Sequence, residues 1–262
     1  MSKKNNPLNQ LRYRICELAF FAKEGHVPSS LSILDMLYVL YAKFVNTELT
    51  KKNSPNKEHV ILSKGHGCMA QYVVLEEKNI LKEKDLNTFG KFYSRFGGHP
   101  DSNKILGIDA STGSLGHGFP FAAGIAYAKK IKKIKSRVYC IIGDGECNEG
   151  TIWETCLISS HHKLDNLVCL LDNNISSKRA VDLQDLVKKF RSFGWETLKI
   201  NGHSSSDLIR ALKRKNKKPL MIVCDTIKGK GVSFMEKNQH EWHHKKIEYT
   251  DLKKIKKILL DT

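Results

Sequence analysis

Residues 138–174 read VYCIIGDGECNEGTIWETCLISSHHKLDNLVCLLDNN and contain two apolar, β-rich runs, each followed by a polar cluster. The first run, Val138–Ile142, precedes Gly143–Gly145, and the second, Leu167–Leu171, precedes Asp172–Asn174. The segment between them, Asn148–Lys163, has the character of a helix. A strand–helix–strand crossover makes the two strands parallel and places them next to or near each other. Both polar clusters are therefore expected at the carboxyl edge of the sheet, where open α/β sheets bind ligands.

This geometry brings Asp144 and Asn174 together, although 27 residues separate GDG from the asparagine pair. Carboxylate and amide oxygens are hard donors that suit Mg²⁺ or Ca²⁺ better than zinc. Mg²⁺ completes its octahedron with water and phosphate oxygens, so two protein ligands are sufficient. Gly143 and Gly145 let the backbone approach a phosphate, and the following helix offers free N–H groups. The segment favours a metal-bridged diphosphate; the alternative is that the clusters are ordinary turns after strands.

The rest of the chain alternates strands and helices, which predicts an α/β fold with a mostly parallel central sheet flanked by helices on both faces. Ser29 or Ser30 is expected to cap the second helix, and His203 is expected in a surface loop. Residues 80–97 are expected to hold a helix and a connection, and residues 175–180 a loop. The other expected helices are Pro7–Lys23, Leu31–Phe44, a helix ending near Glu77, Phe119–Lys130, Leu183–Phe193, Asp207–Lys213 and Asp251–Leu260, and the other strands are His59–Leu62, Trp195–Ile200 and Leu220–Asp225.

Length and composition indicate one domain over residues 1–262, because the chain shows neither an internal repeat nor a flexible linker. No run approaches the ~20 apolar residues of a membrane span. The start, MSKKNNPLNQ, lacks the apolar region of a signal peptide. The seven cysteines form no CxxC pair and several fall on expected strands, which favours buried, reduced thiols and a cytoplasmic protein.

The formal net charge of +17 comes mostly from lysines that are spread over helix faces and loops. They are not interleaved with aromatic residues, and no nucleic-acid recognition motif accompanies them, so a nucleic-acid partner is not expected. Solvated lysine faces are the favoured interpretation, and an acidic protein partner is the alternative. The same positive field would attract anionic sugar-phosphate substrates.

The GDG-x27-NN pattern resembles the thiamine diphosphate signature, and the resemblance covers nearly the whole chain from about Leu8. Further motifs follow in the order found in transketolases, whose amino-terminal, diphosphate-binding part the chain resembles. These motifs are Ser63–Gly67, Gly98–Asp101, Ser111–Gly118, Glu149-Gly150 and Trp242-His243. A dinucleotide-binding fold is disfavoured, because GSLGHG has the wrong glycine order for GxGxxG and GDGECN lacks the third glycine.

The resemblance implies a thiamine diphosphate-binding fold and assigns roles to residues. Ser176 would supply a backbone carbonyl as a third ligand beside Asp144 and Asn174 to Mg²⁺, with Ca²⁺ or Mn²⁺ as possible substitutes. Glu149 would lie on a proton path between paired active sites. The residue at position 117, usually Gln in the family, is His here. The implied catalytic histidines are His26, His66, His99 and His243, and the implied cofactor-binding residues are His66, Gly113, Ser114, Leu115, Gly143, Asp144, Gly145, Glu146 and Asn174.

The reaction implied by the resemblance is transfer of a two-carbon ketol unit from a ketose phosphate to an aldose phosphate in the pentose phosphate pathway. Full-length transketolases continue into a pyrimidine-binding domain and a carboxyl-terminal domain, and the glutamate that activates the cofactor lies beyond the part that this chain resembles. We therefore expect a split transketolase that acts only with a separate carboxyl-terminal subunit, as a hetero-oligomer. The alternatives are a subunit of a related thiamine enzyme, such as a deoxyxylulose-phosphate synthase or a 2-oxoacid-processing enzyme, and a non-catalytic binding protein with a degenerate site.

Overall fold

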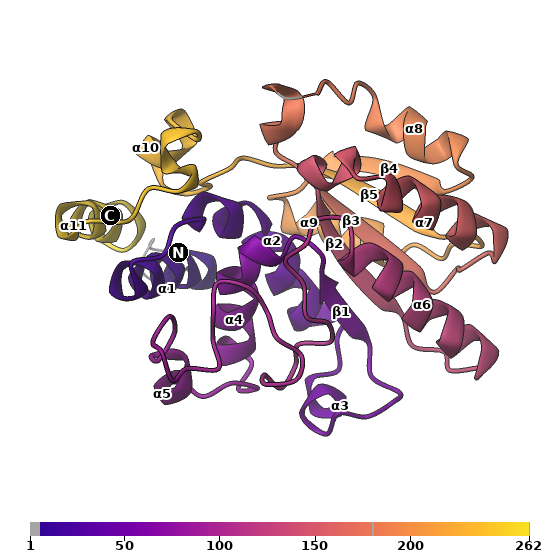
Figure 1. Cartoon of the computed structure of the whole chain (residues 1–262), viewed down its shortest axis with the longest axis horizontal. Coiled ribbons are helices and arrows are strands. Elements are labelled where there is room, and N and C mark those ends of the chain that lie inside the picture. Colours follow the sequence, from indigo (N-terminus) through magenta and orange to yellow (C-terminus); the bar gives the residue numbers. More distant parts are fainter. Residues whose placement is uncertain (1–5, 180, 262) are drawn as a thin grey trace.

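Five parallel strands form a sheet in the order β1-β2-β3-β5-β4 (Figure 1). The structure is a computed structural model that describes residues 6–179 and 181–261. Two sequence predictions fall partly outside the described residues. Residues 1–5 belong to the start that lacks a signal-peptide pattern, and Ala180 belongs to the expected 175–180 loop. The predicted α/β class with a parallel sheet is confirmed. The strands are β1 His59–Leu62, β2 Val138–Gly143, β3 Leu167–Asn173, β4 Glu196–Asn201 and β5 Leu220–Asp225.

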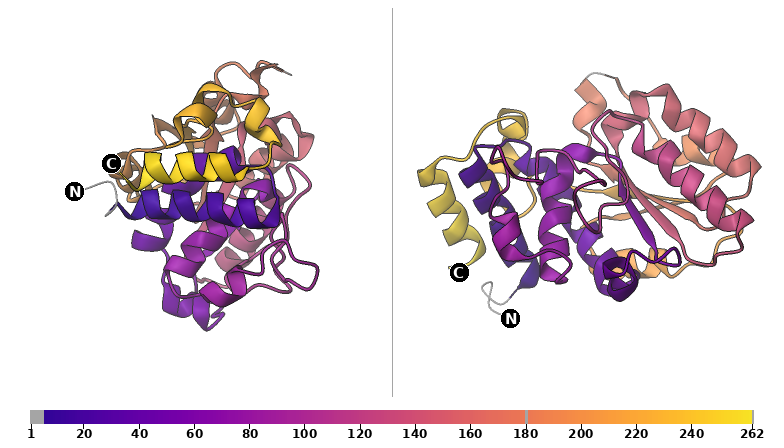
Figure 2. Two further views of the ribbon diagram at one scale, coloured as in Figure 1. Left: turned by 90° about the vertical axis from the view of Figure 1, so that its left-hand side faces the viewer. Right: turned by 60° about the horizontal axis from the view of Figure 1, so that its bottom comes forward.

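Helices cover both faces of this sheet (Figure 1). Side chains from α1, α2, α4, α9 and α11 fill the core on one face, and side chains from α6, α7 and α8 fill it on the other. Figure 2 shows α11 lying alongside α1, so the two ends of the described chain are neighbours. None of the helices in the described part of the chain is long and apolar enough to cross a membrane. The helices are α1 Pro7–Ala22, α2 Val27–Lys43, α3 Thr47–Lys51, α4 Cys68–Glu77, α5 Glu83–Leu86, α6 Gly118–Ile131, α7 Gly150–His161, α8 Leu186–Ser192, α9 Ser205–Leu212, α10 Ser233–Lys237 and α11 Tyr249–Leu259.

The apolar strand sequences follow from this two-sided burial. Alternate side chains of a strand point to opposite faces, so a strand covered on both faces must be apolar throughout. In β2, Tyr139 and Ile141 join one core, whereas Cys140 and Ile142 join the other. All seven cysteines of the chain are buried free thiols, as expected.

The expected start of α2 is wrong. The helix begins at Val27 instead of Leu31, and its N-cap is His26, which has a left-handed backbone with φ of 60°. Pro28 lies in the first turn, where its fixed φ favours a helix and its missing N–H costs nothing. Ser29 and Ser30 are consequently buried residues of the helix and do not cap it.

Other differences also come from local caps and turns. Helix α8 begins at Leu186 instead of Leu183, because the Asp185 side chain accepts a hydrogen bond from the Lys188 backbone N–H. Of residues 80–97, the short helix α5 and a series of turns are found; one turn contains Gly90, whose φ is 74°. The sequence did not predict the short helices α3 and α10, which are too short to show a helical period.

Replacing Gly118 by alanine is expected to destabilise the chain by about 1–3 kcal/mol, because the new Cβ would overpack a fixed backbone. It would lie 2.6 Å from the Cα atom of Ser63, in the turn that follows β1. Gly124→Ala in the same helix is the matched control, since its Cβ would meet no atom within 4 Å. We expect this control to gain about 0.5–1 kcal/mol of helix propensity. Urea unfolding measures both changes, and a Gly118→Ala variant as stable as the wild type would contradict the overpacking.

Candidate active site

A pocket of about 330 Å³ opens at the carboxyl edge of the sheet. Its walls come from the segments that follow β1, β2, β3 and β5, from the turn before α2 and from the loops before α6. The register pairs Gly143 of β2 with Asp172 of β3, so the two polar clusters are adjacent, as the crossover predicted. The lining residues are His26, Ser29, Lys64, His66, His99, Gly113, Leu115, Gly143, Asp144, Gly145, Glu146, Asn174, Ser176, Lys228 and His243.

The pocket contains most of the residues that the sequence singled out, including all four histidines. Ser114 and Glu149 are not among the lining residues, and both are exposed. Three lining residues, Ser29, Lys64 and Lys228, are not among the site residues that the sequence predicts. Lys64 has a signal in the sequence, because it lies two residues beyond the end of a strand, within the Ser63–Gly67 motif. Ser29 has no such signal in the sequence, because a serine at an expected helix start is interpreted as a helix cap.

Oxygen atoms converge where the two polar clusters meet. The carboxylate of Asp144 accepts hydrogen bonds from the Ser176 hydroxyl at 3.1 Å and from the Ser177 N–H and hydroxyl, each at 3.2 Å. The Asn174 amide nitrogen donates to Asp172 at 2.8 Å. The Asn174 carbonyl oxygen accepts from the Ser176 N–H at 3.1 Å. Asp172 therefore orients the amide, whose oxygen meets the N–H of Ser176, the residue that also contacts Asp144.

This cluster fits a hard divalent cation with a diphosphate. Asp144, Asn174 and Ser176 offer one carboxylate and neutral oxygens, the donor set that Mg²⁺ prefers. A Cβ built on Gly145 would meet no atom within 4 Å, so there is open space beside the cluster. Three protein ligands leave coordination positions for phosphate oxygens and water.

A buried ion pair lies next to the oxygen cluster and is linked to it through Asn174. The Lys64 ammonium lies 2.5 Å from the Asp172 carboxylate, and both side chains are no more than 2% exposed. Asp172 also accepts hydrogen bonds from the hydroxyls of Ser32 and Thr226. Burial alone would raise the pKa of Asp172, but the Lys64 charge and these hydrogen bonds outweigh it and lower the pKa. Asp172 thus stays ionised and holds Asn174 in place.

Glu146 ties three loops of the site together. Its carboxylate accepts hydrogen bonds from the Ser63 hydroxyl at 2.6 Å and from the N–H groups of Gly116 and Gly143, each at 2.9 Å. Burial raises the pKa of Glu146 despite these bonds. In the structure the Glu146 carboxylate is hydrogen-bonded to protein donors and joins the segments after β1 and β2 to the loop before α6. Its role in cofactor binding stays a prediction.

Three of the four predicted histidines form a ring cluster. The ring centroid of His26 lies 5.4 Å from that of His66 and 5.1 Å from that of His243. Burial, reinforced by neighbouring positive charges, lowers the pKa of His26 and of His243 to about 4. These imidazoles are therefore neutral at pH 7, and each can donate and accept a hydrogen bond. His99 stands on another wall, where its ring packs against Gly113.

Lys228 adds a positive group to the same wall. Its ammonium lies 2.6 Å from Nδ1 of His243. Burial, and then the charge of Lys64, lowers the pKa of Lys228 to about 8. Lys228 thus remains largely cationic at pH 7 and fixes the orientation of the His243 ring.

The expectation that His203 belongs to a surface loop is wrong for its side chain, which is 9% exposed. Its Nδ1 lies 3.0 Å from Asp35, and its Nε2 accepts a hydrogen bond from the Ile227 N–H at 2.9 Å. Asp35 is also paired with Arg12 at 2.8 Å. His203 therefore anchors the Ile227-Lys228 segment to α2, and no pattern in the sequence links residues so far apart.

Replacing His66 by asparagine is expected to reduce the loss of stability in acid. Burial lowers the pKa of His66 to about 2 in the folded chain, whereas an unfolded histidine titrates near 6.5. Below pH ~6.5 the unfolded chain binds a proton that the folded chain does not, so the free energy of unfolding falls as the pH falls. His66 contributes at most about 1.4 kcal/mol per pH unit to this slope.

Urea unfolding of wild type and His66→Asn between pH 7.5 and 4.5 measures this slope. The exposed His161 supplies the control variant His161→Asn, which should follow the wild type. Equal slopes for wild type and His66→Asn would contradict a neutral, buried His66.

Comparison with known proteins places the chain among thiamine-dependent enzymes. The family described as transketolase, thiamine diphosphate binding domain, matches residues 4–260. An apulose-4-phosphate transketolase subunit of Phocaeicola vulgatus is 36% identical over 241 residues, which cover 89% of this chain and 85% of that protein. A 6-deoxy-6-sulfo-D-fructose transketolase subunit of a Clostridium species is 38% identical over 223 residues, covering 81% of this chain and 80% of that protein.

A solved structure agrees with this placement. Transketolase from Campylobacter jejuni superimposes with a TM-score of 0.83 at 30% sequence identity. The match covers 95% of this chain but only 41% of that protein. The chain therefore spans about two fifths of this transketolase, but most of the length of the two subunit relatives.

Proposed function

The chain belongs to the transketolase family, and on this premise we propose that it is the amino-terminal subunit of a split transketolase. One observation carries the proposal: a single pocket places His26, His66, His99 and His243 beside the oxygen cluster of Asp144 and Asn174. Such a pocket combines a place for a metal-bound diphosphate with neutral proton-transfer groups next to it. The two subunit relatives, which have similar lengths, support the assignment to a subunit.

In this proposal the Asp144 carboxylate, the Asn174 amide oxygen and the Ser176 backbone carbonyl would hold Mg²⁺, or Ca²⁺ or Mn²⁺ in its place, together with the diphosphate of thiamine diphosphate. The backbone at Gly143 and Gly145 would approach the phosphates, and Gly113, Ser114 and Leu115, from the loop before α6, would bind the cofactor. When bound, thiamine diphosphate supplies the carbanion that adds to the ketose carbonyl.

The histidines manage the protons of the ketol transfer. The C2–C3 bond of the ketose breaks, and a neutral imidazole accepts the proton of its C3 hydroxyl as the aldehyde forms. When the two-carbon unit adds to the acceptor aldose, a histidine returns a proton to the oxygen of the acceptor aldehyde. Lys228 makes this wall positive, which suits a substrate that carries an anionic group.

Substrate identity is the finer part of the proposal. The pentose phosphates xylulose 5-phosphate and ribose 5-phosphate are the first pair that we propose, as in the pentose phosphate pathway. The relatives are named for apulose 4-phosphate and 6-deoxy-6-sulfo-D-fructose, so a branched sugar phosphate or a sulfosugar is the second possibility. All of these carry an anionic group.

We propose further that a separate carboxyl-terminal subunit supplies the pyrimidine-binding and carboxyl-terminal domains, and that the two chains form a cytoplasmic hetero-oligomer. The support is that the chain matches two fifths of a full-length transketolase and most of two proteins named as subunits. Glu149 is exposed outside the pocket, where it is available for the proposed proton path between paired sites.

A ketol-transfer assay with thiamine diphosphate and Mg²⁺ tests the proposal. It compares this chain, the carboxyl-terminal subunit encoded beside it, and the mixture, with each of the substrates above. We expect activity in the mixture alone, and a loss of about 10²-fold or more in kcat/KM for His66→Ala. His161→Ala, at an exposed position, is the matched control and should keep full activity.

Two outcomes would overturn the proposal. Activity of the chain alone would refute its dependence on a partner. No activity in a mixture that demonstrably binds the cofactor would move the assignment to related thiamine chemistry, such as deoxyxylulose-phosphate synthesis or 2-oxoacid processing.

A further inference from the structure

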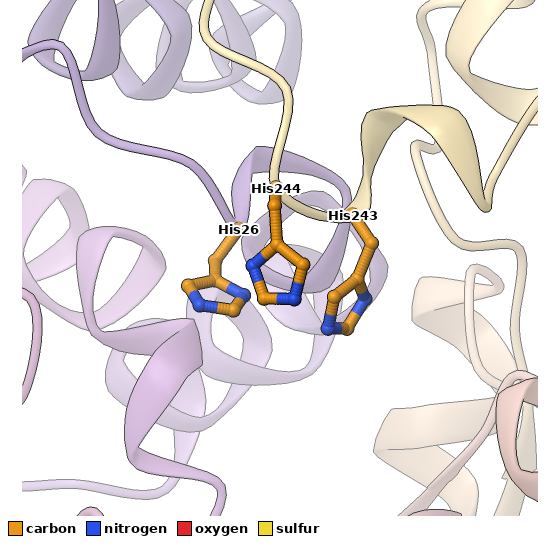
Figure 3. Close-up of side chains that lie close together, drawn as sticks. All are labelled: His26, His243 and His244. Carbon is orange, nitrogen blue, oxygen red and sulfur yellow. The ribbon is translucent and has the colours of Figure 1, made fainter.

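His26, His243 and His244 lie side by side with their rings close together (Figure 3). His26 precedes α2, and His243 and His244 come from the segment that leads to α11. Ligand atoms of the three side chains all lie within 4.8 Å of one another. The ring centroid of His244 is 4.8 Å from that of His26 and 4.3 Å from that of His243. His244 has no role in the proposed ketol transfer, and it does not line the 330 Å³ pocket described above.

The backbone holds these histidines in place. The His26 N–H donates a hydrogen bond to the His243 carbonyl oxygen at 3.1 Å. Gly25 packs so closely on the backbone of His244 that an added Cβ would lie 3.0 Å from the His244 carbonyl oxygen. The cluster thus rests on two backbone segments that are tied to each other.

The three side chains differ in how available their ring nitrogens are as ligands. Nδ1 of His26 is buried and has no hydrogen-bond partner in the structure. Nδ1 of His243 accepts a hydrogen bond from the Lys228 ammonium, so Nε2 carries the ring proton, and His243 can bind a metal only when Lys228 releases Nδ1. His244 is exposed, so solvent can reach the cluster and supply a further ligand.

We propose that His26, His243 and His244 form a binding site for a divalent transition-metal cation such as Zn²⁺. Imidazole suits Zn²⁺, Cu²⁺ and Ni²⁺, whereas the Asp144 cluster suits Mg²⁺, so the two sites select different metals. Three protein ligands plus water make an open tetrahedral site. The nearby ammonium of Lys228 opposes a cation, and we therefore expect reversible binding rather than a permanent structural metal.

A cation bound at this site would affect catalysis, and this consequence rests on the proposed function. A cation bound to His26 and His243 removes both imidazoles from the substrate. Zn²⁺ would then inhibit ketol transfer, and a chelator would restore it.

Calorimetric titration of the full chain with ZnCl₂, in the presence of excess Mg²⁺ to fill the oxygen cluster, tests the site. We expect one Zn²⁺ per chain in the wild type, and affinity about 100-fold weaker or lost in His244→Ala. Because His244 is exposed, its replacement leaves the core intact. The matched control is His161→Ala, which removes one ring of the adjacent His161–His162 pair on α7 and its cap. Equal Zn²⁺ binding by wild type and His244→Ala would overturn the proposal.

The activity arm separates this inference from the proposed function. In the mixture with the carboxyl-terminal subunit, Zn²⁺ should inhibit the wild type much more strongly than His244→Ala. If Zn²⁺ inhibits the wild type and His244→Ala equally, although His244→Ala has lost Zn²⁺ binding in the titration, the proposed effect on catalysis is overturned and the metal site stands. A mixture inactive without any Zn²⁺ would count against the proposed function, and the binding titration would still decide the metal site.

Discussion

Asp144→Ala is expected to lose Mg²⁺-dependent binding of thiamine diphosphate, by at least about 100-fold in affinity. Among the three proposed ligands Asp144 is the carboxylate, whereas Asn174 and Ser176 are neutral, so the variant removes the charge that compensates the cation. It also removes the acceptor that holds the hydroxyls of Ser176 and Ser177. Calorimetry on the mixture of the two subunits, with Mg²⁺ and with EDTA, measures the effect.

Two further variants make this test specific. Asp144→Asn keeps the shape of the side chain and removes its charge, so it should also weaken binding if the charge is what matters. The control variant is Asp165→Ala. Asp165 lies just before β3, at the opposite edge of the sheet, and its replacement removes an exposed ion pair with Lys130. This control should bind like the wild type. Undiminished Mg²⁺-dependent binding by Asp144→Ala would refute the ligand assignment.

Lys64→Met is expected to lower the free energy of unfolding by about 3–5 kcal/mol, because it leaves the Asp172 carboxylate buried without its counter-charge. Asp172 is fully buried and Lys64 is 2% exposed, so water cannot replace the lost partner. The loss should extend to the cofactor site, because Asp172 orients Asn174. Urea unfolding gives the change in stability.

A double variant separates the ion pair from the packing of the lysine chain. Lys64→Met combined with Asp172→Asn removes the unpaired charge, and we expect it to recover a large part of the lost stability. Lys104→Met is the surface control, since the Lys104 side chain is 63% exposed in its pair with Asp101. Its effect should stay within about 0.5 kcal/mol. A single variant Lys64→Met as mild as this control would show that the buried pair contributes little.

The sheet was predictable because its signals are local. Continuous apolar runs mark strands that are covered on both faces, and β1 and β5 have the predicted bounds. Helix boundaries were less predictable, because they depend on individual caps. At α2, His26 in a left-handed conformation replaced the expected serine cap. At α8, Asp185 moved the start by three residues.

The site was predictable in part, for two different reasons. The meeting of Asp144 with Asn174 followed from the crossover, because a parallel strand pair puts both carboxyl ends at one edge. The four histidines came from a resemblance to a family. Nothing in their spacing shows that His26 and His243, at opposite ends of the chain, contact each other.

By itself, the sequence determined the parallel sheet, the edge that carries the site and the oxygen donors gathered there, because strand period and crossover geometry are properties of short segments. Only the tertiary structure decided the Lys64–Asp172 pair, the contact of His203 with Asp35 and the meeting of His244 with His26. These contacts join residues far apart in the chain and leave no periodic pattern. Packing of the helices on the sheet sets which of these groups lose water, and the loss of water sets which partners and protonation states they adopt.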